Sequence, residues 1–164
     1  MAKDGKFTGG AYAYLMFISD LYTRCGKDLN LTFDEFIVLQ VVVSQWMYNT
    51  NQNEISSYNK MFENSINHQD YLKTVENTKL TILSIANILA QPKETVRRRI
   101  QKLIDFQLLT KKNDGGIVLG ENYIIIIRKF SHETTRQFSR MIKYLAKEEL
   151  IQDLVEFDDQ KINF

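Results

Sequence analysis

Apolar side chains recur at intervals of three and four residues along much of the chain, the spacing that gathers them on one face of an α-helix. Two such stretches flank Pro92, the only proline. The first is expected to begin after Thr81, whose hydroxyl can accept hydrogen bonds from the free amides at a helix start. Its apolar positions are Ile82, Ile85, Ala86 and Leu89. We therefore predict a short helix that packs through one face.

Pro92 suits the first turn of a second helix, where its missing amide hydrogen costs little. At 100° per residue, one side of this helix carries Val96, Ile100, Leu103, Ile104 and Gln107. The opposite side carries polar residues, namely Glu94, Arg98, Gln101, Lys102 and Asp105, with Arg97 and Arg99 on the flanks. The second helix is therefore predicted to pack through its apolar side and to expose a largely basic one.

Two short strands are expected after this helix, over residues 108–110 and 116–119. The turn between them, residues 113–116, contains the Asp-Gly pair that favours a β-hairpin. Lys111 and Lys112 lie near its tip. Residues 80–120 thus predict a winged helix-turn-helix, which is two helices followed by a small β wing.

The rest of the chain is predicted to be helical scaffold. Residues 1–10 are expected to form a flexible arm, with Gly9-Gly10 as its hinge, and residues 11–48 the N-terminal scaffold or dimerisation helices. Residues 11–23 are apolar on most sides, so this helix must be covered on more than one face. A central core helix or a subunit interface would satisfy this, and we favour the interface. Thr32 and Glu35 form a capping box at the start of the next helix.

Residues 49–79 are a polar, asparagine-rich insertion, with one helical piece expected near residues 68–75. Residues 121–164 should supply C-terminal helices. Residues 123–127 fit either a buried strand or the start of a helix, and the architecture favours the helix. The predicted fold class is mainly α with a small β wing, a winged helix-turn-helix with N- and C-terminal dimerisation helices.

Positive charge is concentrated in residues 91–112, which contain seven basic residues and two acidic ones. The segment carries +5 while the whole chain carries +1, so the remainder carries −4. A run of three arginines alone fits a solvated helix face equally well. In combination with the preceding helix, the turn and the hairpin, it indicates a localised surface for a polyanion.

The side chains that would face base edges are those at the start of the second helix, since its first turns enter the major groove. They are Lys93, Glu94, Arg97, Arg98 and Gln101. The predicted phosphate contacts, which add affinity and salt dependence, are Thr95, Arg99, Lys102, Lys111 and Lys112.

Residues 85–109 resemble the winged helix-turn-helix of bacterial transcription regulators. The portion Glu-Thr-Val-x-Arg, residues 94–98, is similar to the recognition helix of the Crp/Fnr family, a resemblance that places Lys93, Glu94 and Arg98 at base-contacting positions. Residues 1–80 show helical periodicity and few glycines, unlike the glycine-rich β-roll that precedes this motif in Crp/Fnr proteins.

The architecture is more similar to that of the MarR family. There a first helix serves dimerisation, a second begins with a pattern like residues 31–39, the winged motif follows, and long helices close the dimer. The resemblance implies a MarR-like homodimer.

No enzyme is expected. His68 and His132 lie far apart in the chain with no cysteine or carboxylate cluster at metal-ligand spacing, and the lone Cys25 has no evident base. No glycine-rich phosphate loop is present. We predict no cofactor, no metal and no catalytic residue. The single cysteine and the polar start of the chain, without a signal-peptide pattern or a membrane-spanning apolar run, favour the cytoplasm.

The sequence thus predicts a sequence-specific regulator of transcription that binds double-stranded DNA as a homodimer, with a small-molecule effector between core and dimer helices as a further partner. Two alternatives stay open at this point. One is a winged-helix module that binds protein, and the other is a replication-initiator type of DNA binder.

Overall fold

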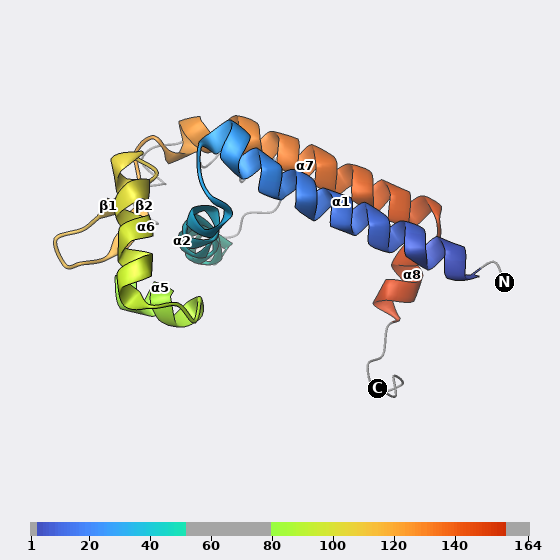
Figure 1. Ribbon diagram of the computed structural model, residues 1–164, viewed down its shortest axis with the longest axis horizontal. Coiled ribbons are helices and arrows are strands. Elements are labelled where there is room, and N and C mark those ends of the chain that lie inside the picture. Colours follow the sequence, from blue (N-terminus) through green and yellow to red (C-terminus); the bar gives the residue numbers. More distant parts are fainter. Residues whose placement is uncertain (1–2, 52–79, 157–164) are drawn as a thin grey trace. The chain divides into compact units, whose positions relative to one another are not determined.

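The computed structural model describes residues 3–51 and 80–156 (Figure 1). The chain divides into two compact units. Unit 1 comprises residues 1–28 and 129–164, and unit 2 comprises residues 29–128.

The described part of unit 2 contains α2 (Phe33–Asn51), α5 (Ile82–Ile88), α6 (Lys93–Asp105), β1 (Leu109–Lys111), β2 (Ile117–Leu119) and the start of α7 (Tyr123–Lys147). The strands pair antiparallel, with Leu109 opposite Leu119 and Lys111 opposite Ile117. The amide of Ile117 also donates to the carbonyl of Leu80, over 2.7 Å. The described residues are mainly helical with a small antiparallel sheet, which confirms the predicted class of a mainly α fold with a small β element.

The core of unit 2 gathers apolar side chains from α2, α6 and the hairpin. Those from α2 include Val38, Leu39 and Val42; those from α6 are Val96, Ile100 and Leu103; those near the strands are Leu108, Leu109 and Ile117. Each exposes at most 1% of its surface. The predicted inner face of the basic helix is confirmed at its three central positions, with Ile104 half-buried.

Gln107 was predicted to continue this inner face, and that prediction is wrong. Helix α6 ends at Asp105, so helical spacing no longer applies at Gln107, which is exposed. Its backbone has φ 59°, and the amide of Leu108 donates to the carbonyl of Leu103 over 2.9 Å. The chain therefore turns sharply out of the helix at this residue.

Glycine is required at position 120, beside that turn. A Cβ atom placed on Gly120 would lie 2.2 Å from the carbonyl oxygen of Gln107. The amide of Gly120 donates to the carbonyl of Leu108 over 2.9 Å. The end of β2 and the turn after α6 can approach this closely only because Gly120 has no side chain.

Side-chain caps fix the starts of α2 and α5. The amide of Thr32 donates to Glu35 Oε2 over 2.8 Å, and the amide of Glu35 donates to Thr32 Oγ1 over 3.3 Å, so the predicted capping box is confirmed. Thr81 caps α5 together with Ser84. Pro92 lies at the N-cap of α6, one residue before the first turn that was predicted for it.

The turn between α5 and α6 passes through Ala90, whose φ of 50° lies in the left-handed region. A non-glycine residue there costs roughly 1–2 kcal/mol of backbone energy. The amide of Gln91 donates to the carbonyl of Ala86 over 3.0 Å, which satisfies a carbonyl at the end of α5. Hydrogen bonding thus stabilises this strained turn.

Unit 1 consists of α1 (Lys3–Leu29), the part of α7 (Tyr123–Lys147) that follows Arg128, and α8 (Leu150–Val155). Helices α1 and α7 run side by side (Figure 1), and the rings of Phe17 and Phe138 have centroids 5.7 Å apart. The helix expected over residues 11–23 is confirmed within the longer α1. Residues 123–127 are helical, as the architecture favoured.

The flexible arm predicted over residues 1–10 is wrong for residues 3–10, because α1 begins at Lys3 and includes Gly9 and Gly10. Residues 1–2 lie outside the described residues. A Cβ atom on Gly9 would lie 2.5 Å from the Tyr144 hydroxyl oxygen, and one on Gly10 would lie 2.8 Å from Leu150 Cδ1. These glycines therefore let α7 and α8 approach α1, and their lack of a side chain serves packing rather than bending.

Arg24 connects the two long helices inside unit 1. Its guanidinium donates to Asp20 over 2.7 Å and to Thr134 Oγ1 over 3.0 Å, and it lies 4.7 Å from the centroid of the Phe130 ring. The side chain is almost fully buried. Partners on both helices satisfy a charge that would otherwise be costly to bury.

Residues 52–79 lie outside the described residues, and with them most of the predicted insertion and its helical piece. Within residues 3–51 and 80–156, no helix has the length and apolar character needed to cross a membrane.

Candidate nucleic-acid interface

Helix α6 presents its polar side to solvent. The side chains of Glu94, Arg97 and Arg98 expose 56%, 51% and 76% of their surface, and Lys93 and Gln101 are exposed as well. The structure thus brings together on one open surface all five residues that were predicted to face bases. Their role toward DNA stays a prediction.

Glu94 organises the two outward arginines. It accepts two hydrogen bonds from Arg97, each of 2.8 Å, and one from Arg98 Nε over 3.2 Å. Hydrogen bonding from Arg97, and to a smaller extent from Arg98, lowers the pKa of Glu94 to about 2. The carboxylate is therefore ionised at neutral pH and offsets one of the two guanidinium charges, while Arg98 keeps most of its surface open.

Two other basic residues of α6 turn toward α2 instead. Arg99 pairs with Asp34 and also donates to Gln91, and its side chain is only 20% exposed. Lys102 Nζ lies 2.8 Å from Glu35 Oε2. Both were predicted to contact phosphate, and the structure instead places carboxylates of the same unit against them. Thr95, in the same predicted set, is half-buried.

The hairpin supplies the remaining predicted phosphate contacts. Lys111 is exposed at the end of β1 and Lys112 is half-buried at the start of the turn. The amide of Lys112 donates to the carbonyl of Gly116 over 2.8 Å, and Asp114 Oδ1 accepts from the amide of Gly116 over 2.9 Å. Gly115 takes φ 85°, which a glycine adopts without strain. The predicted turn therefore forms, with both lysines beside it.

Unit 1 carries a second notable surface, made of large apolar side chains in contact with water. On α1 these are Tyr12, Tyr14, Leu15, Met16, Ile18 and Tyr22; on α7 they include Phe138, Ile142 and Tyr144. We call these nine side chains the apolar face. The charged residue of α1 between residues 8 and 23, Asp20, points its carboxylate at Arg24. No other charged residue of α1 therefore lies among these apolar side chains between residues 8 and 23.

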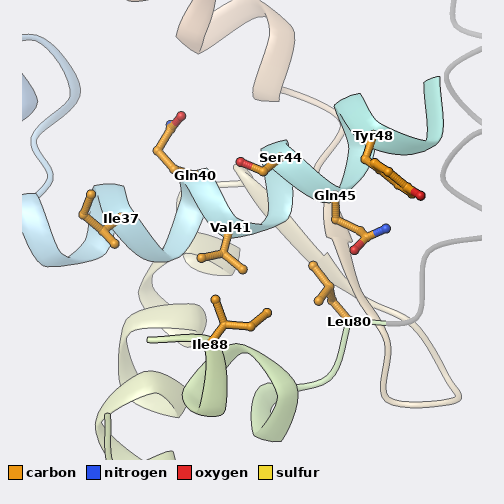
Figure 2. A pocket seen from close by; sticks show the side chains of 8 residues that line it. All are labelled: Ile37, Gln40, Val41, Ser44, Gln45, Tyr48, Leu80 and Ile88. Atoms are coloured by element: carbon orange, nitrogen blue, oxygen red, sulfur yellow. The ribbon is translucent and has the colours of Figure 1, made fainter. Parts of the chain in front are cut away.

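A pocket of about 480 Å³ lies between α2 and the region of α5 (Figure 2). Along α2 it is lined by Ile37, Gln40, Val41, Ser44, Gln45 and Tyr48, and opposite them lie Leu80 and Ile88. The lining combines aliphatic groups with neutral amides and hydroxyls. The predicted effector site lay elsewhere, between core and dimer helices, and it stays a prediction.

The expectation that the chain is not an enzyme stays a prediction. Cys25 is buried, and burial raises the pKa of its thiol to about 11, so the thiol is protonated and unreactive at neutral pH. Within residues 3–51 and 80–156, no three histidine, cysteine or acidic side chains are grouped so that they could hold a metal ion.

Asp34 and Glu35 were not predicted from the sequence to belong to this region. Glu35 was identified as a capping residue, but its pairing with a lysine 67 positions later has no local signal.

Comparison with known proteins found no relative of this chain. No protein-family model matches it, and neither the curated proteins nor the solved structures include one that is significantly similar.

Proposed function

We propose that this chain is a regulator of transcription that binds double-stranded DNA, with α5, α6 and the hairpin acting as a winged helix-turn-helix. The observation that carries the proposal is the exposed, largely cationic side of α6, with Lys93, Arg97 and Arg98 open to solvent in a chain of net charge +1. A major groove admits a helix of this kind, and guanidinium groups can bridge the acceptors of guanine.

The hairpin supports the same proposal. It follows α6 directly and places Lys111 and Lys112 beside its turn. In this arrangement α6 supplies base contacts and the hairpin supplies phosphate contacts, which add affinity without sequence preference. Arg99 and Lys102 are left out of the phosphate set because Asp34 and Glu35 already pair with them.

We also propose that the protein acts as a homodimer through the apolar face of unit 1. Taking roughly 150–250 Å² for a whole aromatic side chain, the nine side chains together expose on the order of 800 Å², the area that each partner buries in a standard interface. A second copy covers such a face symmetrically and presents two recognition helices to paired half-sites.

Gel-shift titration of two variants tests the DNA-binding proposal. Arg98→Ala should weaken binding to a duplex selected from a random pool by roughly 1–3 kcal/mol and relax preference at one base pair. Lys112→Ala should weaken binding to all duplexes alike and reduce the slope of log affinity against log salt by about 1.

Unchanged binding in both variants would remove the proposed interface. A wild-type protein that binds no duplex at low salt would favour the protein-binding winged-helix module instead. DNA binding without any effect on transcription from a promoter that carries the selected site would favour the replication-initiator type.

A further inference from the structure

We infer that Asp34 and Glu35, at the start of α2, position α6 for DNA, and that Arg99 and Lys102 act by holding the helix rather than by touching phosphate. This inference rests on the proposed function for its effect on DNA. It assigns a positioning role to two acidic residues that the sequence analysis did not connect with the basic helix.

Four basic residues of α6 fall into two groups by the element that supplies their partner. Glu94 of α6 itself pairs with Arg97 and Arg98, whereas α2 supplies the partners of Arg99 and of Lys102, whose side chain is 40% exposed. The side chain of Arg98 is 76% exposed and that of Arg99, its neighbour, is 20% exposed. Lys102 follows Arg99 by three positions, so both lie on the same side of the helix. Their partners, Asp34 and Glu35, are adjacent in the chain, so two pairs on neighbouring positions connect α6 to the first turn of α2.

Glu35 has two partners on different elements. Its carboxylate accepts the amide of Thr32 over 2.8 Å and the ammonium of Lys102 over 2.8 Å, and its side chain is only 11% exposed. Burial alone would raise the pKa of Glu35, but the hydrogen bonds from Lys102 and Thr32 lower it by more. One ionised carboxylate therefore caps α2 and holds α6, which ties the position of α6 to the start of α2.

Arg99 adds a contact to the turn before α6. Besides Asp34 it donates to the side chain of Gln91, the second residue of the left-handed turn at Ala90. The guanidinium thus joins α6, α2 and the turn. Because both sets of bonds are directional, they restrict rotation of α6 about its own axis.

The apolar contacts of α6 determine which side of the helix faces the core. Val96, Ile100 and Leu103 are buried in close-packed surroundings, and the ion pairs add directional bonds to that packing. Base recognition depends on the placement of Arg97 and Arg98 within a fraction of an ångström, which requires support from neighbouring side chains. Loss of the ion pairs should therefore reduce discrimination between duplexes more than it reduces affinity for any duplex.

A charge exchange between positions 34 and 99 tests the inference. Arg99→Asp alone places two carboxylates together and should lower the ratio of affinities for selected and random duplex, roughly threefold to tenfold for a coupled pair. Adding Asp34→Arg restores an opposite pair and should restore the ratio, although position 99 now carries negative charge. If Arg99 instead contacts phosphate, the double variant will bind as weakly as Arg99→Asp.

Lys102→Met supplies the second arm, with Lys111→Met as its matched control. Loss of Lys111 should reduce the salt slope by about 1, whereas loss of Lys102 should lower the affinity ratio and leave the slope unchanged. An equal reduction of the slope in both variants would overturn the inference. Circular dichroism spectra and urea midpoints identify any variant that fails to fold.

Failure of the proposed function can be told apart from failure of this inference. If the wild type binds no duplex, the proposed function is lost and the pairs are judged on urea unfolding alone. A urea midpoint that is higher in the exchanged double variant than in Arg99→Asp alone and in Asp34→Arg alone would then support the role of the pair in holding α6. A midpoint that falls further in the double variant would reject it.

Discussion

Helices α6 and α1 expose opposite kinds of surface. Helix α6 buries Val96, Ile100 and Leu103 and exposes charged and amide side chains to solvent. Helix α1 buries small residues and a paired arginine against α7 and shows water tyrosines and aliphatic groups, including Tyr14 and Leu15. The exposed side of α6 is polar and is well solvated without a partner. The exposed side of α1 is apolar, and association would remove that apolar area from water.

This difference separates two jobs that the proposed function requires. A surface for a polyanion must stay solvated and cationic until its ligand arrives, because its affinity derives from phosphate and base contacts. A dimer surface gains its stability from burial of apolar area. The contrast between α6 and α1 therefore matches a DNA-binding unit and an association unit.

The largest expected effect comes from the buried side of α6. Leu103→Ala should destabilise the protein by about 2–5 kcal/mol, because it leaves a cavity beneath a helix that packs through few residues. Leu83→Ala, on the exposed side of α5, should cost less than about 0.5 kcal/mol. Urea unfolding of both variants measures the difference, and equal losses would contradict the described core of unit 2.

A lysine on α1 should have the next largest effect, on association. Leu15→Lys introduces a charge near the middle of the apolar face of each subunit, and burying it unpaired should weaken dimerisation by about two orders of magnitude, or roughly 2.7 kcal/mol. Both residues favour helix, so α1 itself should persist.

Sedimentation velocity over a range of concentrations gives the dimerisation constant. Leu83→Lys, on α5 of unit 2, adds the same charge at another exposed leucine and should leave association unchanged. A wild type that stays monomeric at high concentration would remove the proposed role of the apolar face.

The smallest effect concerns the charge that α6 presents. Glu94→Gln should release Arg97 and Arg98 from their shared carboxylate and raise affinity for random duplex, with a salt slope steeper by about 1. Asp105→Asn removes the same formal charge from α6 at a residue paired with Gln101, and should change the slope less.

The pKa of Glu94 gives this prediction a pH dependence. Because that pKa is lowered to about 2, the carboxylate keeps its charge as the pH falls from 8 to 5, and only below that range does protonation begin to imitate Glu94→Gln. Titration of Glu94 should therefore make no contribution to wild-type affinity between pH 5 and 8. An equal pH response of Glu94→Gln and wild type in that range checks the point.

Several features could be predicted from sequence because their causes are local. The capping box at Thr32, the cap at Thr81 and the hairpin turn at Gly115 each depend on groups within four residues of one another. The inner face of α6 follows from helical spacing in the same way. These local signals are sufficient to predict which residues lie on the exposed side of α6 and beside the hairpin turn.

Other features depended on partners far along the chain. Gly9 and Gly10 favour a hinge by composition, but side chains of α7 and α8 close against them and make glycine the residue that fits inside a helix. Gln107 matches the helical period, but the turn toward Gly120 ends the helix first. In both cases the sequence prediction failed because packing outweighed a local preference.

The sequence by itself determined where α2, α5 and α6 begin and which side of α6 is charged, because capping and periodicity act within a few residues. Only the tertiary structure decided which of those charges remain available, since Arg99 and Lys102 pair with carboxylates 65 and 67 positions away. Ion pairing between elements follows distance in space, and no periodicity in the chain encodes it.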